Sequence, residues 1–164
     1  MVVLLRFLRY NRYIHPKGGI CLRILCVCTG NICRSPMLEE LLRQELNTRG
    51  MTEHTVSSAG TGTYDGAPAS EHAVTAMKEL GYDITAHRSR QLTSEIVENT
   101  DVFVALSPEH GVTLAFQYGA DPEKILLVGA GIPDPYGRNL ATYRTCLSLL
   151  VESMPQLIDD LGAL

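Results

Sequence analysis

The segment CTGNICRSP, at residues 28–36, sets the architecture of this chain. It follows an apolar run at residues 24–27 and precedes residues 37–43, whose apolar side chains recur at helical spacing. The order is therefore strand, tight loop and helix, with Ser35 expected at the N-cap and Pro36 at the first helical position. A loop that enters a helix in this way turns free backbone N–H groups and the positive end of the helix dipole toward one point. The segment thus predicts an anion-binding site.

Two side chains of this loop predict its chemistry, because Cys28 opens it and Arg34 closes it. A cysteine that faces a helix N-terminus beside a guanidinium favours the thiolate, which is the nucleophilic form. The planar fork of Arg34 can hold two oxygens of a phosphoryl group. Ser35 could donate its hydroxyl to the Cys28 thiolate. Gly30 and Asn31 permit backbone angles that other residues avoid.

The residues around this loop resemble a known family. Val27 to Pro36 is similar to the signature loop of the low-molecular-weight protein phosphatases, mostly phosphotyrosine enzymes with a phosphoarginine branch. The resemblance covers about residues 24–161 and implies a phosphatase domain over residues 22–164, with residues 1–21 as an N-terminal extension. It implies substrate-binding roles for Thr29, Gly30, Asn31, Ile32, Cys33, Ser35, Tyr64 and Tyr136.

Strand and helix patterns alternate along the rest of the chain. Strands are expected at residues 22–27, 55–59, 101–106 and 124–128, and helices at residues 36–48, 70–80, 92–99, 108–118 and 141–161. This alternation predicts a single three-layer α/β domain, with a parallel sheet and helices on both faces. The resemblance adds a four-stranded sheet in flavodoxin-like order. Ligands then bind at the carboxyl ends of the strands, which is where Cys28 lies.

A second catalytic group is expected in the loop Asp134-Pro135-Tyr136. Phosphoryl transfer to sulfur needs an acid for the leaving group and then a base for the water that releases the phosphocysteine. Pro135 restricts the residue before it to extended geometry and so helps to orient Asp134. Alone, such a dipeptide indicates only a turn. Together with the Cys28 loop it resembles the general-acid loop of the family, and Asp134 is predicted to serve as acid and base in turn.

Other positions follow from the resemblance. Asn31, Ser58 and His87 look like the buried polar network that holds the signature loop; the alternative for His87, a structural histidine, is nearly the same role. Tyr64 and Tyr136 are expected to wall the entrance and stack on the substrate; the alternative is that they are surface tyrosines. Ser107 stands where many family members have an acidic residue, so the role of this position is left open.

Composition limits the class of protein. The 164 residues suffice for one domain, and a formal net charge of −4 argues against a nucleic-acid partner. The sequence has no apolar run near 18 residues, so no membrane span is expected. Five cysteines, four of them within residues 21–33, form no secreted disulfide framework and favour a cytoplasmic setting. A zinc or iron–sulfur site is the rival interpretation; we expect no metal, no cofactor and a monomer.

Residues 1–19 are basic and apolar but do not fit a signal peptide, because the apolar run is short and interrupted. They are interpreted as an appendage or as translation begun upstream of the domain, with a surface-binding amphipathic segment as the alternative.

The expected function is hydrolysis of phosphorylated protein side chains through a phosphocysteine. A thiol-coupled arsenate reductase is one rival, but it needs downstream resolving cysteines, and only Cys146 follows Cys33. A phosphoprotein-binding module is the other, and it would have lost Cys28 or Asp134. Thr29 is shared with the phosphoarginine branch, whereas the two tyrosines suit phosphotyrosine, which is the default substrate of the family. A regulatory Cys28–Cys33 disulfide is a further hypothesis.

Overall fold

A four-stranded parallel sheet forms the centre of this computed structural model, which describes residues 13–14 and 20–164. The strands are β3 (Arg23–Cys28), β4 (Thr55–Gly60), β5 (Val102–Ala105) and β6 (Ile125–Leu127), and their spatial order is β4-β3-β5-β6. The first strand of the sheet therefore lies between the second and the third, as flavodoxin-like order requires. The expected fold class is confirmed.

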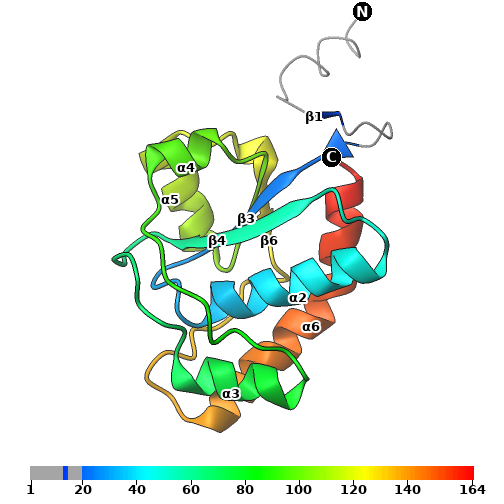
Figure 1. Ribbon diagram of the computed structural model, residues 1–164. Helices are drawn as coiled ribbons and strands as arrows, with labels where there is room; N and C mark the ends of the chain where they lie inside the picture. Colours follow the sequence, from blue (N-terminus) through cyan, green and yellow to red (C-terminus); the bar gives the residue numbers. More distant parts are fainter. Residues whose placement is uncertain (1–12, 15–19) are drawn as a thin grey trace, which may run out of the picture.

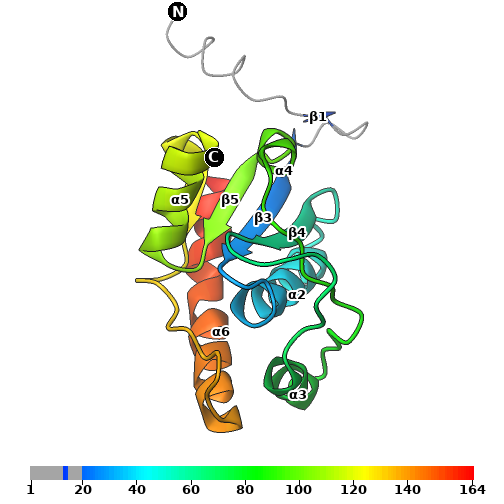
Figure 2. The same ribbon diagram turned by 90° about the vertical axis from the view of Figure 1, so that its left-hand side faces the viewer.

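Helices cover both faces of the sheet. One face carries α2 (Arg34–Thr48), α3 (Glu71–Glu79) and α6 (Leu140–Gly162), and the other carries α4 (Ser94–Glu98) and α5 (Pro108–Tyr118), as Figures 1 and 2 show. A 3-10 turn, η1 (Pro122–Lys124), leads into β6. The three layers follow from right-handed crossovers between parallel strands, which place successive helices on the two faces.

The alternating side chains of β3 explain why it is the central strand. Ile24, Cys26 and Cys28 belong to the core beneath α2, α3 and α6, whereas Leu25 and Val27 belong to the core beneath α4 and α5. All five are almost fully buried. A strand that is apolar on both sides fits only between two helical layers.

The amino end of the sheet is held by an ion pair between Arg23 and Asp101. The Arg23 guanidinium makes two hydrogen bonds to the carboxylate, at 2.9 and 3.0 Å, and the Arg23 backbone N–H donates a third at 2.8 Å. Burial alone would raise the pKa of Asp101, but the hydrogen bonds and charge of Arg23 outweigh it and lower that pKa. The pair fixes the starts of β3 and β5 relative to each other.

The helix boundaries agree with the sequence pattern to within two residues; α4 begins at Ser94 where residue 92 is expected, and the other two-residue difference is at the start of α2. This helix begins at Arg34 with Cys33 as its N-cap, and no side chain caps it. The expectation of Ser35 at the N-cap is therefore wrong, because the Ser35 hydroxyl is bonded inside the preceding loop. Pro36 still lies in the first helical turn, where its missing N–H costs no bond.

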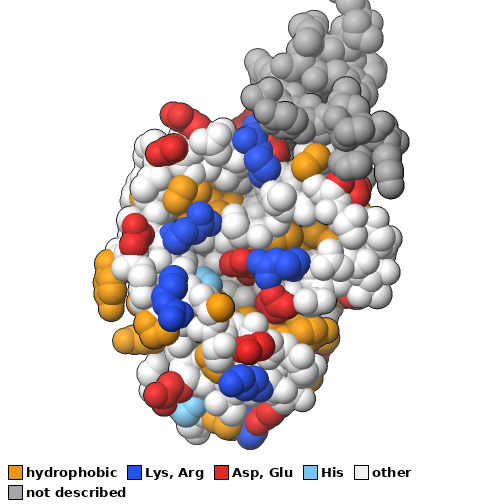
Figure 3. Space-filling model, viewed as in Figure 1, with side chains coloured by type: hydrophobic (Ala, Val, Ile, Leu, Met, Phe, Trp, Pro, Cys, Tyr) orange, Lys and Arg blue, Asp and Glu red, His pale blue; other side chains and the backbone are white. Residues whose placement is uncertain are grey.

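Most of the expected N-terminal extension, residues 1–21, lies outside the described residues. Within it, β1 (Tyr13–Ile14) pairs antiparallel with β2 (Ile20–Cys21), apart from the main sheet. In the part of the chain that the structure describes, no helix is long and apolar enough to cross a membrane. Basic and acidic side chains are both scattered over the face drawn in Figure 3.

Candidate active site

The loop between β3 and α2 wraps around the sulfur of Cys28. Cys28 is 2% exposed and ends its strand. Its Sγ lies 3.0 Å from the Ser35 Oγ and accepts a hydrogen bond from the Asn31 backbone N–H at 3.2 Å. The sulfur thus faces the first turn of α2 and has two polar partners there.

Asn31 is the residue that holds this loop in shape. Its φ is 52°, the one left-handed backbone among non-glycine residues 13–14 and 20–164. The side-chain amide donates to the Ser35 and Ser58 hydroxyls, both at 2.8 Å, and the amide oxygen accepts from the Arg90 backbone N–H at 2.8 Å. With these three hydrogen bonds and no exposure to solvent, the Asn31 side chain joins the loop to Ser58 and Arg90.

Further support for the loop comes from α2 and from residues 86–91. His87 Nε2 lies 2.7 Å from the Asn31 carbonyl oxygen, and since a carbonyl only accepts, this nitrogen carries the proton. Burial lowers the pKa of His87, so the ring is neutral near pH 7. The Ser58 hydroxyl donates to Glu39, a residue that sequence reasoning missed. The structure therefore brings Asn31, Ser58 and His87 together, and their role in support of the loop stays a prediction.

Arg34 and Asp134 meet at the mouth of the loop. One Arg34 amino group donates to the Ile132 carbonyl at 3.0 Å, and the other lies 3.1 Å from the Asp134 carboxylate. The Arg34 Nε is buried and has no hydrogen-bond partner, the one such side-chain nitrogen or oxygen in the described part of the chain. A buried donor of this kind is costly unless a ligand satisfies it.

The loop between β6 and α6 delivers Asp134 to this place. Pro135 is buried, and the Asp134 carboxylate accepts a hydrogen bond from the Tyr136 backbone N–H at 3.2 Å. Gly137, with φ of 72°, then turns the chain toward α6. The carboxylate itself is half exposed, at 51%, so it can reach both Arg34 and a ligand in solution.

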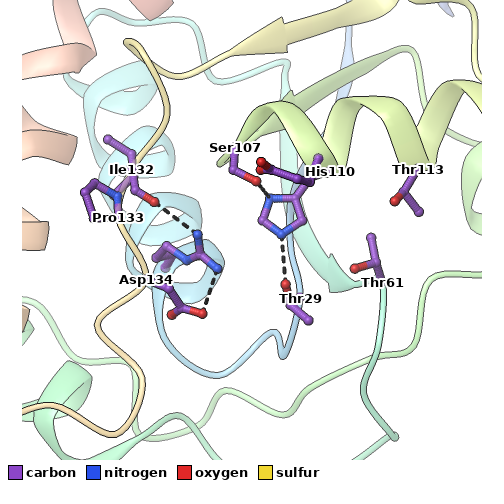
Figure 4. A pocket seen from close by; sticks show the side chains of 10 residues that line it. Thr29, Thr61, Ser107, His110, Thr113, Ile132, Pro133 and Asp134 are labelled. Carbon is purple, nitrogen blue, oxygen red and sulfur yellow. Dashed lines mark hydrogen bonds and ion pairs between the residues drawn. The ribbon is translucent and has the colours of Figure 1, made fainter.

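A cavity of about 400 Å³ opens between the Asp134 loop and the start of α5 (Figure 4). Its lining residues are mostly polar: Thr29, Arg34, Thr61, Ser107, Glu109, His110, Thr113, Ile132, Pro133 and Asp134. Among these, Glu109, His110 and Thr113 come from α5, and sequence reasoning did not single them out. No tyrosine is among these lining residues.

His110 is the principal side chain that sequence reasoning missed. Its Nε2 lies 3.0 Å from the Thr29 Oγ1 and its Nδ1 lies 2.9 Å from the Ser107 Oγ (Figure 4). Burial and the nearby charge of Arg34 lower the pKa of His110 to about 4, so the imidazole is neutral at physiological pH. The only signal in the sequence was its position in the first turn of a helix that follows a buried strand.

The remaining predicted site residues differ in how far they are buried and in whether they line the cavity. Tyr64 and Tyr136 are 72% and 67% exposed and do not line the cavity, so their stacking role stays a prediction. Gly30 and Ile32 are half-buried loop residues. Cys33 is buried against the Tyr143 hydroxyl at 3.1 Å, and burial raises its pKa. All five cysteines are free thiols.

The comparisons with known proteins agree with this geometry. Residues 23–163 match the family described as low molecular weight phosphotyrosine protein phosphatase. The chain belongs to this family. Its members share the cysteine-dependent type of active site, so the chain is an enzyme of that type.

The individual relatives include proteins named as tyrosine phosphatases and one named as an arginine phosphatase. The chain is 34% identical to the probable low molecular weight protein-tyrosine-phosphatase EpsP of Ralstonia nicotianae, over 86% of this chain and 97% of that protein. It is 32% identical to the protein-arginine-phosphatase of Bacillus subtilis, over 84% of this chain and 95% of that protein. The crystal structure of the low molecular weight protein tyrosine phosphatase from T. tengcongensis superposes with a TM-score of 0.78, at 34% identity over 84% of this chain and 98% of that one.

Proposed function

We propose that this phosphatase hydrolyses phosphorylated protein side chains through a phosphocysteine on Cys28. The observation that carries the proposal is the buried, unpartnered Nε of Arg34 beside the loop that holds the Cys28 sulfur. A phosphoryl oxygen would satisfy this nitrogen, and the loop N–H groups would hold the others. Gly30, Ile32 and Cys33 would contribute backbone to the same cradle.

The chemistry proceeds in two steps. The Cys28 thiolate attacks phosphorus in line, while Asp134 protonates the leaving atom. Asp134 then takes a proton from water, which attacks the phosphocysteine and expels the thiolate. The Ser35 hydroxyl, 3.0 Å from the sulfur, stabilises the thiolate in both steps. The positive charge comes from Arg34 and the helix end, so the proposed mechanism uses no metal.

Phosphotyrosine is the proposed substrate side chain, in keeping with the family description and with the expected stacking role of Tyr64 and Tyr136, both of which are exposed. Phosphoarginine is the second candidate, favoured by the lining of the cavity. Its hydroxyls and the carboxylates of Glu109 and Asp134 offer acceptors to a guanidinium, and the relative from Bacillus subtilis carries the name protein-arginine-phosphatase.

Two measurements test the proposal. Purified protein should hydrolyse p-nitrophenyl phosphate without added metal, and rates on matched phosphotyrosine and phosphoarginine peptides should then rank the two substrates. Cys28→Ser should abolish turnover but still bind inorganic phosphate, because the cradle survives. Cys21→Ser, at a thiol that donates to the Glu53 carbonyl outside the site, is the matched control and should keep full turnover. Turnover that persists in Cys28→Ser would contradict the mechanism.

A further inference from the structure

Four side chains form a chain of hydrogen bonds along one wall of the active-site cavity. Ser107 donates to Glu109 and thereby lowers the pKa of that carboxylate. Ser107 and Thr29 then bond the two ring nitrogens of His110, at 2.9 and 3.0 Å. Three of the four residues, Ser107, Glu109 and His110, are at the start of α5, and Thr29 directly follows the nucleophile in the sequence; Figure 4 draws the two contacts of His110.

The chemistry of the four groups gives this series of hydrogen bonds a single donor-to-acceptor direction. A carboxylate only accepts, so the single proton of Ser107 is given to Glu109. The Ser107 oxygen then accepts from the Nδ1–H of His110. A neutral imidazole carries one N–H, so its Nε2 must accept, and Thr29 must donate to it. The Thr29 hydroxyl therefore presents only lone pairs to the cavity.

The charges around His110 keep this arrangement in place near neutral pH. Arg34 from α2 opposes its protonation, whereas Glu109 on α5 and Asp134 on the opposite loop favour it. Burial adds to the effect of Arg34, and the pKa of His110 is about 4 as a result. The ring is 4% exposed, so its two bonded neighbours hold it in one orientation.

We propose that His110 is a positioning residue that fixes Thr29 as a hydrogen-bond acceptor for the water that hydrolyses the phosphocysteine. The inference rests on the proposed function. Thr29 and Asp134 line the same cavity from different elements. A water molecule has two protons, and its attack requires a lone pair directed at phosphorus. With one proton directed to Asp134 and the other to Thr29, the remaining lone pairs are free for the attack.

The step balances as follows. The water oxygen bonds to phosphorus while the S–P bond breaks, and the electron pair of that bond leaves on the Cys28 sulfur. Asp134 takes one water proton. The other stays on the departing phosphate and is hydrogen-bonded to the Thr29 Oγ1.

The test uses the separation between the two steps. p-Nitrophenolate is a good leaving group, so hydrolysis of the phosphocysteine should limit kcat. The ratio kcat/KM reports only on formation of the phosphocysteine. His110→Ala and Thr29→Val should each lower kcat about tenfold and leave kcat/KM within about twofold. Acid quench should trap more phosphocysteine in both variants than in the wild type. Thr29→Ser, which keeps the hydroxyl, should restore kcat.

An alcohol supplies a second readout, because it carries a single proton and that proton goes to Asp134. In the presence of glycerol, both variants should therefore form several times more glycerol phosphate relative to inorganic phosphate than the wild type does. The double variant should be no slower than Thr29→Val, since the two residues act through one contact. His72→Ala, at an exposed histidine whose ring packs on Tyr143 outside the cavity, is the matched control.

The outcomes distinguish this inference from the function on which it rests. Equal losses in kcat and kcat/KM, or an unchanged product ratio with glycerol, would overturn the role of His110 while the phosphatase mechanism stands. A wild-type enzyme that forms no phosphocysteine would overturn both. Thr29 is exposed, so Thr29→Val folds independently of any packing defect left by His110→Ala.

Discussion

The Arg34 guanidinium and the Asp134 carboxylate form an ion pair at 3.1 Å across the mouth of the catalytic loop. Arg34 is almost fully buried and Asp134 is half exposed, so the pair joins a buried cation to an anion that solvent can reach. A phosphate dianion that enters the loop competes with Asp134 for this cation. In the proposed mechanism, binding of substrate would therefore free the Asp134 side chain from this ion pair so that it can turn toward the leaving group.

Removal of this carboxylate should separate turnover from anion affinity. Asp134→Ala is expected to slow hydrolysis of a poor leaving group by about 10²–10⁴. The same change should tighten binding of inorganic phosphate a few-fold, because Arg34 no longer has an internal partner. Competitive inhibition by phosphate measures the second effect. Asp121→Asn, at the exposed N-cap of η1, is the control and should alter neither quantity. Weaker phosphate binding in Asp134→Ala would contradict the competition.

Gly60 ends β4 beside the loop that follows Cys28. A Cβ at this position would meet the Thr29 carbonyl oxygen inside van der Waals contact and lie 3.1 Å from the Asn31 Cβ. Gly60→Ala should therefore lower the free energy of unfolding by roughly 1–3 kcal/mol and displace the loop, with a loss in kcat/KM. At Gly62 a Cβ would make only an ordinary contact with Thr29, at 3.7 Å. Equal unfolding midpoints for Gly60→Ala and Gly62→Ala would refute this account.

Buried histidines should make the fold sensitive to mild acid. The pKa of His110 is about 4 in the folded protein and about 6.5 in an unfolded chain, so the unfolded state binds more protons between these values. The free energy of unfolding should therefore fall as pH drops from about 6.5 to about 4, by up to ~3 kcal/mol from this residue. Burial lowers the pKa values of His54 and His87 as well, and both act in the same direction.

Urea unfolding at several pH values measures this dependence. His110→Gln should reduce the slope of stability against pH over that window, whereas His72→Gln, at an exposed histidine, should leave it unchanged. An unaltered slope in His110→Gln would assign the acid sensitivity to other groups.

Oxidation offers a test of the hypothesis that Cys28 and Cys33 pair. Peroxide should convert Cys28 to a sulfenic acid, and attack by Cys33 would then form the disulfide and release water. Burial raises the pKa of Cys33, so the rate of disulfide formation should increase with pH above neutrality. Mass spectrometry should show loss of two hydrogens in the wild type and sulfinic acid on Cys28 in Cys33→Ser. Sulfinic acid in the wild type would exclude the disulfide.

Local chemistry explains which parts of the site could be predicted from sequence. Cys28 and Arg34 lie in one contiguous loop, and the strand and helix around them have strong patterns of their own. The expected contact between the Ser35 hydroxyl and the Cys28 sulfur is present, but the N-cap expectation for Ser35 was wrong, because a helix cap is only a local preference and the hydroxyl is engaged by Cys28 and Asn31. Tertiary bonds outweigh local propensity at this position.

His110 could not be predicted because its partner is distant in sequence. A histidine in the first turn of a helix is usually a solvated side chain, and only the sheet order brings α5 against the loop at Thr29. The two tyrosines are a different case. Their residue type suggested a stacking surface, and that role stays a prediction, because both side chains are exposed and neither lines the cavity.

The central position of β3 has a consequence for synthesis of the protein on the ribosome. Its neighbours β4 and β5 emerge later, and the Ile132 carbonyl and Asp134 that partner Arg34 emerge later still. Closing these long loops costs entropy that only the assembled sheet can offset. A nascent chain should therefore carry its cysteine nucleophile through most of translation without a formed anion site, and phosphate in the cell should favour the finished fold.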